Sequence, residues 1–163
     1  MSVRIQENNQ EDIIKLAEAL ILRKDLQTRI ARIRDRLFAN VLVQEGDKPS
    51  EDPSELIARL NETMAELGTL ITRINKTNSN TQMDGKLLAD AITERDMTLR
   101  KVSILREALQ KAADRPNRYS QKEIRLLTPL DVQKEEKIVD QLSYEARVLD
   151  AKIQAKNWEV DLL

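Results

Sequence analysis

Apolar residues recur in three long segments of this sequence at alternating spacings of four and three. Residues with that spacing fall on one face of an α-helix, and such a face has to be buried against a partner. No proline interrupts these segments, as long helices require. We therefore predict an all-α fold. The stripe positions are Leu26, Ile30, Ile33 and Leu37, then Leu60, Met64, Leu67, Ile71 and Ile74, and then Leu88, Ile92, Leu99 and Val102.

Start and stop signals divide the chain into four main helices within a single helical domain, residues 1–163. The predicted ranges are about 11–40, 53–75 and 86–113, with a fourth helix that ends near 160. The second helix begins most clearly, because Asp52 can cap it and Pro53 fits the first helical position. Thr128, Pro129 and Asp131 repeat this signal before the fourth helix. Four helices with three connections most simply form a long up-down-up-down antiparallel bundle.

Two connections between the predicted helices are short, apolar and partly β-branched, namely residues 41–43 and 124–127. β-Branched residues favour strands. These two segments can pair as a tiny two-stranded β patch at one end of the bundle. The alternative is irregular structure, since short apolar runs do not distinguish the two.

The sequence contains neither cysteine nor histidine. This absence removes disulfides, thiolate nucleophiles, Ser-His-Asp catalysis and the usual zinc and di-iron ligands. We therefore expect no enzyme activity, no metal site and no cofactor. The formal net charge is −1, so no attraction to nucleic acid is expected. No segment is long and apolar enough to span a membrane and the first 12 residues lack a signal-peptide core, which predicts a cytoplasmic location.

Polar residues occupy stripe positions that a packed helix would fill with leucine. Asn40 and Asn78 stand at predicted helix ends, where capping accounts for them. Arg95 lies two to three turns inside the third helix, between Ile92 and Leu99. A buried arginine is costly unless it is paired. We expect a carboxylate of this chain, a second subunit or a ligand to meet Arg95.

The predicted topology gathers polar residues at the end of the bundle that holds the chain termini. Arginine beside asparagine and tryptophan can form a pocket for a carboxylate or a phosphate. The alternative, which we favour, is a hydrogen-bonded network that fixes the alignment of the helices. The candidate cluster comprises Arg23, Asn75, Asn78, Arg95, Asp96, Asn157 and Trp158.

A set of sequence segments, in order along nearly the whole chain, carries a family resemblance. The set comprises LAEALILRKDLQ, EGDKPSEDPSELI, RINKTN, Asp84–Gly85, Glu94–Asp96, NRYSQKEI and IQAKNWEVDLL. Together these segments resemble a septicolysin-like family of uncharacterised bacterial proteins, in which a small residue stands where this chain has Glu94. The resemblance implies a small, mostly helical protein with no established activity, catalytic residue or cofactor. The family label implies a cytolysin.

Three functions remain open on the sequence. The first is a self-associating interaction or scaffold protein, a dimer or a higher homo-oligomeric ring, because long amphipathic helices leave apolar stripes to bury. The second is a membrane-active protein, as the family label implies. The third is a binder of a small anionic ligand, or an enzyme without histidine, that uses Arg95, Asp96 and the asparagine cluster. We favour the first, without catalytic activity.

Overall fold

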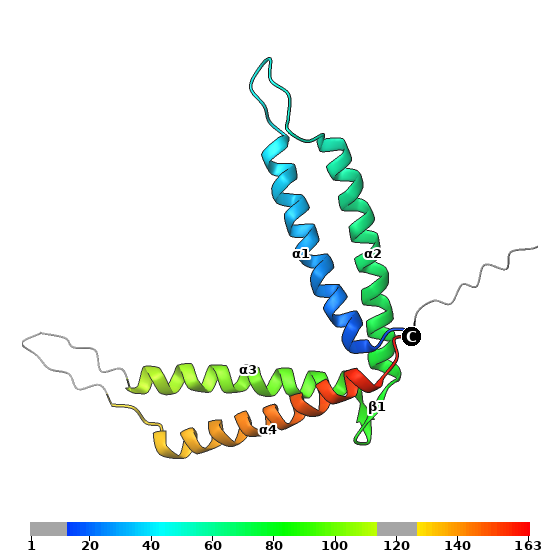
Figure 1. Cartoon of the computed structure of the whole chain (residues 1–163). Coiled ribbons are helices and arrows are strands. Elements are labelled where there is room, and N and C mark those ends of the chain that lie inside the picture. Colours follow the sequence, from blue (N-terminus) through cyan, green and yellow to red (C-terminus); the bar gives the residue numbers. More distant parts are fainter. Residues whose placement is uncertain (1–12, 114–126) are drawn as a thin grey trace, which may run out of the picture. The chain divides into compact units, whose positions relative to one another are not determined.

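The computed structural model describes residues 13–113 and 127–163. The elements are α1 (Leu16–Asn40), α2 (Pro53–Asn80), β1 (Gln82–Met83), β2 (Lys86–Leu87), α3 (Leu88–Ala113) and α4 (Val132–Glu159) (Figure 1). The predicted all-α fold, with four main helices and a tiny two-stranded antiparallel β patch, is confirmed.

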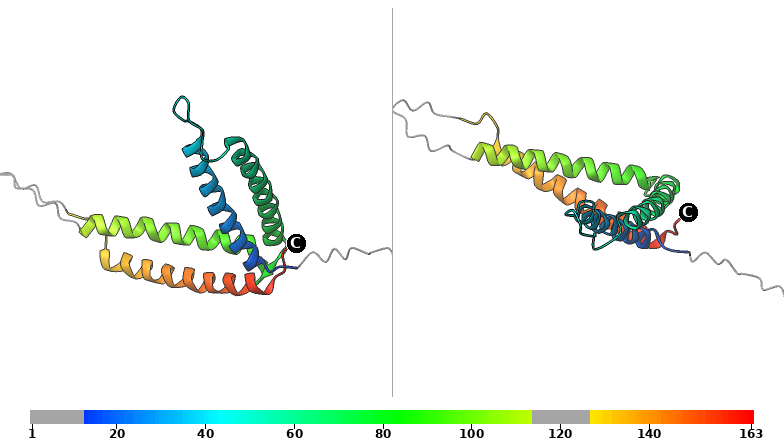
Figure 2. Two further views of the ribbon diagram at one scale, coloured as in Figure 1. Left: turned by 45° about the horizontal axis from the view of Figure 1, so that its top comes forward. Right: turned by 90° about the horizontal axis from the view of Figure 1, so that it is seen from above.

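The chain divides into two compact units, each built on one pair of helices. The first unit contains α1, α2 and the segment Lys156–Leu163, and the second runs from Gln82 to Ala155. The last turn of α4 therefore belongs to the first unit. Within each unit the two long helices lie side by side and run antiparallel, as Figures 1 and 2 show. The single domain over residues 1–163 stays a prediction.

The α1/α2 pair is held together by a seam in which every seventh residue of each helix is buried. The residues are Ala19, Leu26, Ile33 and Asn40 on α1, and Leu56, Thr63, Leu70 and Thr77 on α2. The predicted stripe of α1 is confirmed, but that of α2 was partly wrong, since Met64 is exposed and Thr63 is buried. Thr63 can be buried because its hydroxyl donates to the backbone O of Arg59 at 2.8 Å.

Capping side chains define the helix starts. Asp52 Oδ1 accepts from the backbone N–H of Ser54 at 2.8 Å, and Pro53 is the first residue of α2, so that predicted start is confirmed. Asp131 Oδ1 likewise accepts from the backbone N–H of Lys134 at 3.1 Å at the start of α4. The end predicted for α2 was wrong. The helix continues to Asn80, so Asn78 lies inside it and is not a cap.

The β patch lies at a different place from the one predicted. Residues 41–43 are irregular, and residues 124–126 lie outside the described residues. The strands β1 and β2 instead form a hairpin between α2 and α3, with Met83 opposite Lys86. Its two turn residues, Asp84 and Gly85, have φ of 51° and 81°. A two-residue hairpin turn with two positive φ angles favours this Asp-Gly pair.

The α3/α4 pair carries a sparser seam. Its buried residues are Leu88, Ala91 and Val102 on α3, and Val139, Ser143, Ala146 and Ile153 on α4. The prediction that Leu99 lies on the buried face of α3 was wrong. Leu99 is exposed, and the neighbouring Thr98 is half-buried. Arg95, also predicted for this face, is half-buried.

Candidate functional site

Arg95 extends from α3 toward α4 and is held by two carboxylates. Its Nη1 donates to Asp150 Oδ1 on α4 at 2.7 Å, and its Nε donates to Asp96 Oδ1 at 2.9 Å. The Arg95 side chain is 18% exposed. Desolvation lowers the pKa of Arg95, but the hydrogen bonds to Asp150 and Asp96 outweigh it, so the pKa lies above its ordinary value. Of the three partners expected for Arg95, carboxylates of this chain meet it.

A second polar contact joins α3 to α4, about three turns along α3 from Arg95. Arg106 Nη2 donates to Ser143 Oγ at 2.9 Å, and the Ser143 hydroxyl donates to the backbone O of Val139 at 2.6 Å. An open hollow of about 340 Å³ lies beside this contact, lined by Arg106, Leu109, Glu136, Val139 and Asp140. Both polar contacts cross from one helix to the other, so together they fix how α3 and α4 are aligned.

The loop end of the α1/α2 pair is tied together by Asn40, the last residue of α1. Its Nδ2 donates to the backbone O of Arg36 at 2.9 Å, and its Oδ1 accepts from the backbone N–H of Glu51 at 3.0 Å. The Glu51 carboxylate accepts two hydrogen bonds from the Arg36 guanidinium, the one from Nε at 2.7 Å. These hydrogen bonds hold the pKa of Glu51 below its ordinary value. Asn40 lies at the end of α1 as expected, but the helix is capped at Val41, whose backbone N–H donates to the backbone O of Leu37, and the Asn40 side chain instead ties α1 to the loop.

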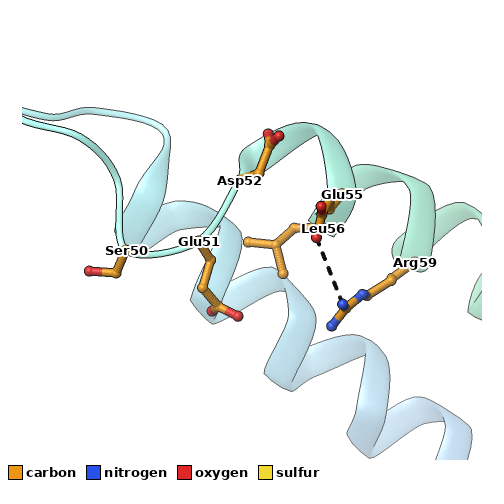
Figure 3. Close-up of a pocket in the computed structure, with 6 residues that line it drawn as sticks. All are labelled: Ser50, Glu51, Asp52, Glu55, Leu56 and Arg59. Carbon is orange, nitrogen blue, oxygen red and sulfur yellow. Dashed lines mark ion pairs between the residues drawn. The ribbon is translucent and has the colours of Figure 1, made fainter.

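A hollow of about 270 Å³ with mostly polar walls lies at this loop end. Figure 3 shows the residues that line it. The lining residues are Ser50, Glu51, Asp52, Glu55, Leu56 and Arg59. Arg59 and Glu55 form an ion pair at 3.8 Å along α2, and Glu51 is engaged by Arg36. Within the described residues, no three carboxylates are grouped so that they could hold a metal ion. The hollow is therefore lined largely by charges that are paired within the chain.

At the other end of the α1/α2 pair, the segment after α4 packs against both helices. The backbone N–H of Leu16 donates to the backbone O of Val160 at 2.8 Å. The backbone N–H of Leu163 donates to Thr77 Oγ1 at 3.0 Å, and Arg73 Nε donates to the backbone O of Leu163 at 3.0 Å. The segment therefore contacts α2 on the side that carries Arg73 and Thr77.

The members of the predicted polar cluster are divided between the two units, so the cluster stays a prediction. Arg95 and Asp96 lie in the second unit, where they hydrogen-bond to each other. Asn157 and Trp158 lie in the first. Asn157 is buried, and its Oδ1 has no hydrogen-bond partner among the described residues. Trp158 is 56% exposed, so its indole N–H is not a buried donor.

The three remaining members of the predicted cluster lie on α1 and α2. Arg23 is half-buried on the seam side of α1, and Asn78 is half-buried on α2. Asn75 is exposed. Asn75 and Asn78 lie on a different surface of α2. This surface is next to the seam that faces α1, because its residues include those that directly follow the seam residues in the sequence.

We call this surface the open stripe of α2. Its members follow one another at alternating spacings of four and three residues, and none is charged: Ile57, Asn61, Met64, Gly68, Ile71, Asn75 and Asn78. Ile57 is 47% exposed and Met64 is 53% exposed. The charged residues of α2 lie on the opposite side of the helix at 3.6 residues per turn; they are Glu55, Arg59, Glu62, Glu66, Arg73 and Lys76.

Sequence reasoning missed the open stripe because it assigned Met64 and Ile71 to the seam that faces α1. The confinement of every charge on α2 to one side was the signal that could have found it. Asp150 was missed for a different reason. Nothing in its spacing distinguishes it from the other charged residues of α4 until α3 is placed beside it.

None of the helices that the structure describes is long and apolar enough to cross a membrane. A comparison with curated proteins gives no match. Among solved structures, the chain is similar to "a functionally unknown conserved protein from Corynebacterium diphtheriae", with 36% sequence identity and a TM-score of 0.86. The match covers 93% of this chain and 100% of that one.

Residues 23–162 match the model of a "family of unknown function (DUF6847)". The resemblance to a septicolysin-like family was therefore wrong, since neither this family nor the similar crystal structure carries that label. The expectation of a cytolysin rested on that label and is withdrawn with it. The chain belongs to DUF6847, a family of unknown function.

Proposed function

We propose that this protein is a non-catalytic interaction protein that self-associates through the open stripe of α2. The observation that carries the proposal is the stripe's composition, a row of uncharged residues along an exposed helix face. The solvent-facing side of a helix ordinarily carries charged and polar residues. An apolar surface that is left exposed and is bordered by polar residues marks an interaction site.

A second copy of the chain is the partner we favour. Soluble oligomers are mostly symmetric assemblies of identical chains. The stripe carries both apolar side chains and asparagine amides, which can donate and accept, so the same surface can complement itself.

The binding of a small anionic ligand is less well supported. Arg95 donates to Asp150 and Asp96, and Arg36 donates to Glu51, so both guanidinium groups already have carboxylate partners. A ligand at either place would have to displace a carboxylate of the chain.

The proposal is tested by light scattering coupled to size-exclusion chromatography over a range of protein concentrations. The wild-type chain is expected to show a mass above that of one chain, increasing with concentration. Met64→Glu places a carboxylate in the stripe, and burial of that charge is costly. We expect it to weaken association at least about 100-fold, which corresponds to about 2.7 kcal/mol.

The matched control is Thr69→Glu, which adds the same charge to an exposed position seven residues from Glu62 and from Lys76, on the charged side of α2. It should associate as the wild type does, and circular dichroism should show the same helix content for both variants. A wild-type chain that stays monomeric up to hundreds of micromolar, or equal weakening by both variants, would contradict the proposal.

A further inference from the structure

The open stripe of α2 is nearly symmetric about Gly68. Asn61 and Asn75 stand seven residues to either side of it, and Met64 and Ile71 stand four and three residues away. If two antiparallel helices are related by a two-fold axis at Gly68, residue 61 of one copy lies opposite residue 75 of the other. Each asparagine amide then meets an amide that can both donate and accept.

Gly68 itself has no role that the single chain explains. A Cβ built at this position would meet no atom within 4 Å, so the packing of the first unit does not require a glycine there. Glycine inside a helix costs about 1 kcal/mol relative to alanine. A residue without a side chain does allow two helices to approach closely. Its position at the middle of the open stripe makes Gly68 the natural point of closest approach.

The charges of α2 distinguish the two possible orientations. Residues 53–66 contain three glutamates and one arginine, a net charge of −2. Residues 67–80 contain one arginine and one lysine, a net charge of +2. These charged residues face away from the stripe, so they act on the partner copy only at long range and mainly at low salt. Antiparallel pairing aligns the negative half of each copy with the positive half of the other, whereas parallel pairing aligns like charges. Antiparallel helix dipoles favour the same orientation.

From these observations, and resting on the proposed self-association, we infer that two copies of α2 pair antiparallel about a two-fold axis, with closest approach at Gly68 and Asn61 of each copy opposite Asn75 of the other. The occupant of the open stripe is thus a second copy of the same helix. The asparagines fix the register of the pair, as a buried asparagine does in a coiled coil.

The chain has no cysteine, so single introduced cysteines report this geometry without background. Gly68→Cys is expected to form a disulfide-linked dimer under mild oxidation, because a two-fold axis at residue 68 brings that position close to its own copy. The substitution leaves the fold intact, since the added side chain enters open space. Thr69→Cys, on the charged side, is the matched control and should stay unlinked.

The orientation is tested with a short bifunctional maleimide. A mixture of the Asn61→Cys and Asn75→Cys variants should cross-link, because those positions face each other. Asn61→Cys alone should not, since its two copies lie on opposite sides of the crossing, about 21 Å apart at 1.5 Å per residue. Cross-linking of Asn61→Cys to itself, without the mixed product, would mean parallel helices and would overturn the inference.

The two proposals fail in different ways. If light scattering shows a dimer that Met64→Glu dissociates but Gly68→Cys forms no disulfide, self-association stands and the crossing at Gly68 is wrong. If the wild-type chain is monomeric and none of the cysteine variants cross-links, both proposals are wrong. Cross-linking of Thr69→Cys as efficient as that of Gly68→Cys would indicate random collision and would also overturn the inference.

Discussion

The α1/α2 pair and the α3/α4 pair both have polar side chains in their seams, but these side chains form different kinds of hydrogen bond in the two pairs. In α1/α2, the hydroxyls of Thr63 and Thr77 donate to carbonyl groups of their own helix. In α3/α4, Arg95 reaches Asp150 and Arg106 reaches Ser143 on the other helix. The same spacing of seam positions therefore supports two kinds of helix pairing.

The difference concerns what fixes the alignment of each pair. A hydrogen bond within one helix does not depend on where the second helix stands, whereas a bond across the seam does. The α3/α4 pair is thus aligned along its length by two polar contacts. The α1/α2 pair is aligned at its ends, by Asn40 and Glu51 at the loop and by the segment that contacts Thr77. Between those ends, apolar packing holds α1/α2 together.

The largest effect should come from removing an apolar side chain from the α1/α2 seam. Leu56 is almost completely buried, so Leu56→Ala loses both its burial and the packing around it. We expect the free energy of unfolding to fall by about 2–5 kcal/mol in a denaturant titration. Leu42→Ala, at an exposed loop position of the same unit, should change it by less than about 0.5 kcal/mol. Similar losses in both variants would show that the seam does not dominate the stability of this pair.

The next largest effect should come from breaking the polar contact across α3/α4. Asp150→Ala leaves Arg95 with Asp96 alone, and we expect a loss of about 1–2 kcal/mol, between that of an exposed and that of a buried ion pair. Asp140→Ala, at an exposed position of the same helix, is the control and should have little effect. An Asp150→Ala chain as stable as the control would mean that the contact does not contribute to pairing.

A double variant sharpens the comparison between the two seams. Arg95→Leu with Asp150→Leu replaces the ion pair by apolar groups, and such replacements are often neutral or stabilising. If the ion pair serves alignment, the double variant should be at least as stable as Asp150→Ala and should show weaker dispersion of methyl signals from α3 and α4 in NMR spectra. Full native dispersion would argue that apolar contacts alone align this pair.

Much of the fold followed from the sequence because spacing and capping are local signals. The starts of α2 and α4 were predicted from Asp52 and Asp131, whose side chains need only the next turn of their own helix. The stripe of α1 was also predicted. The hairpin turn at Asp84 and Gly85 also carried a local signal, the Asp-Gly pair. The β patch was nevertheless predicted at residues 41–43 and 124–127, because those segments are apolar and partly β-branched.

What the sequence did not reveal depends on contacts between distant residues. Thr63 and Thr77 were not among the predicted stripe positions, because only the placement of α1 shows that their side of α2 is covered. The predicted cluster stays a prediction for a similar reason. It requires Arg95 and Trp158 to meet, and these residues belong to different units. The need of Arg95 for a partner was predicted, but the identity of Asp150 was not.

A matched pair of threonines tests whether the ends align α1/α2. Thr63→Val and Thr77→Val each remove a buried hydroxyl that donates within α2, but Thr77 also accepts from the backbone N–H of Leu163. We expect Thr77→Val to be about 1 kcal/mol less stable than Thr63→Val, because the Leu163 N–H loses its acceptor. Denaturant titrations measure this difference, and amide hydrogen exchange at Leu163 should accelerate only in Thr77→Val. Equal stability of the two variants would show that the segment after α4 does not help to align α1 and α2.

The smallest effect should come from titrating the loop end. The Arg36 hydrogen bonds lower the pKa of Glu51 below its ordinary value of 4.5, so the folded state binds this proton less readily than the unfolded chain does. The contribution of Glu51 to stability is therefore present above pH 4.5 and is lost as the pH falls through the lowered pKa. Glu51→Gln should lack this part of the pH dependence, so that its stability approaches that of the wild type on acidification. Both carboxylate and guanidinium are partly exposed, so added salt should reduce the difference at neutral pH. A difference between the two proteins that stays constant from pH 7 to pH 3 would show that the ionisation of Glu51 does not contribute to holding the loop end.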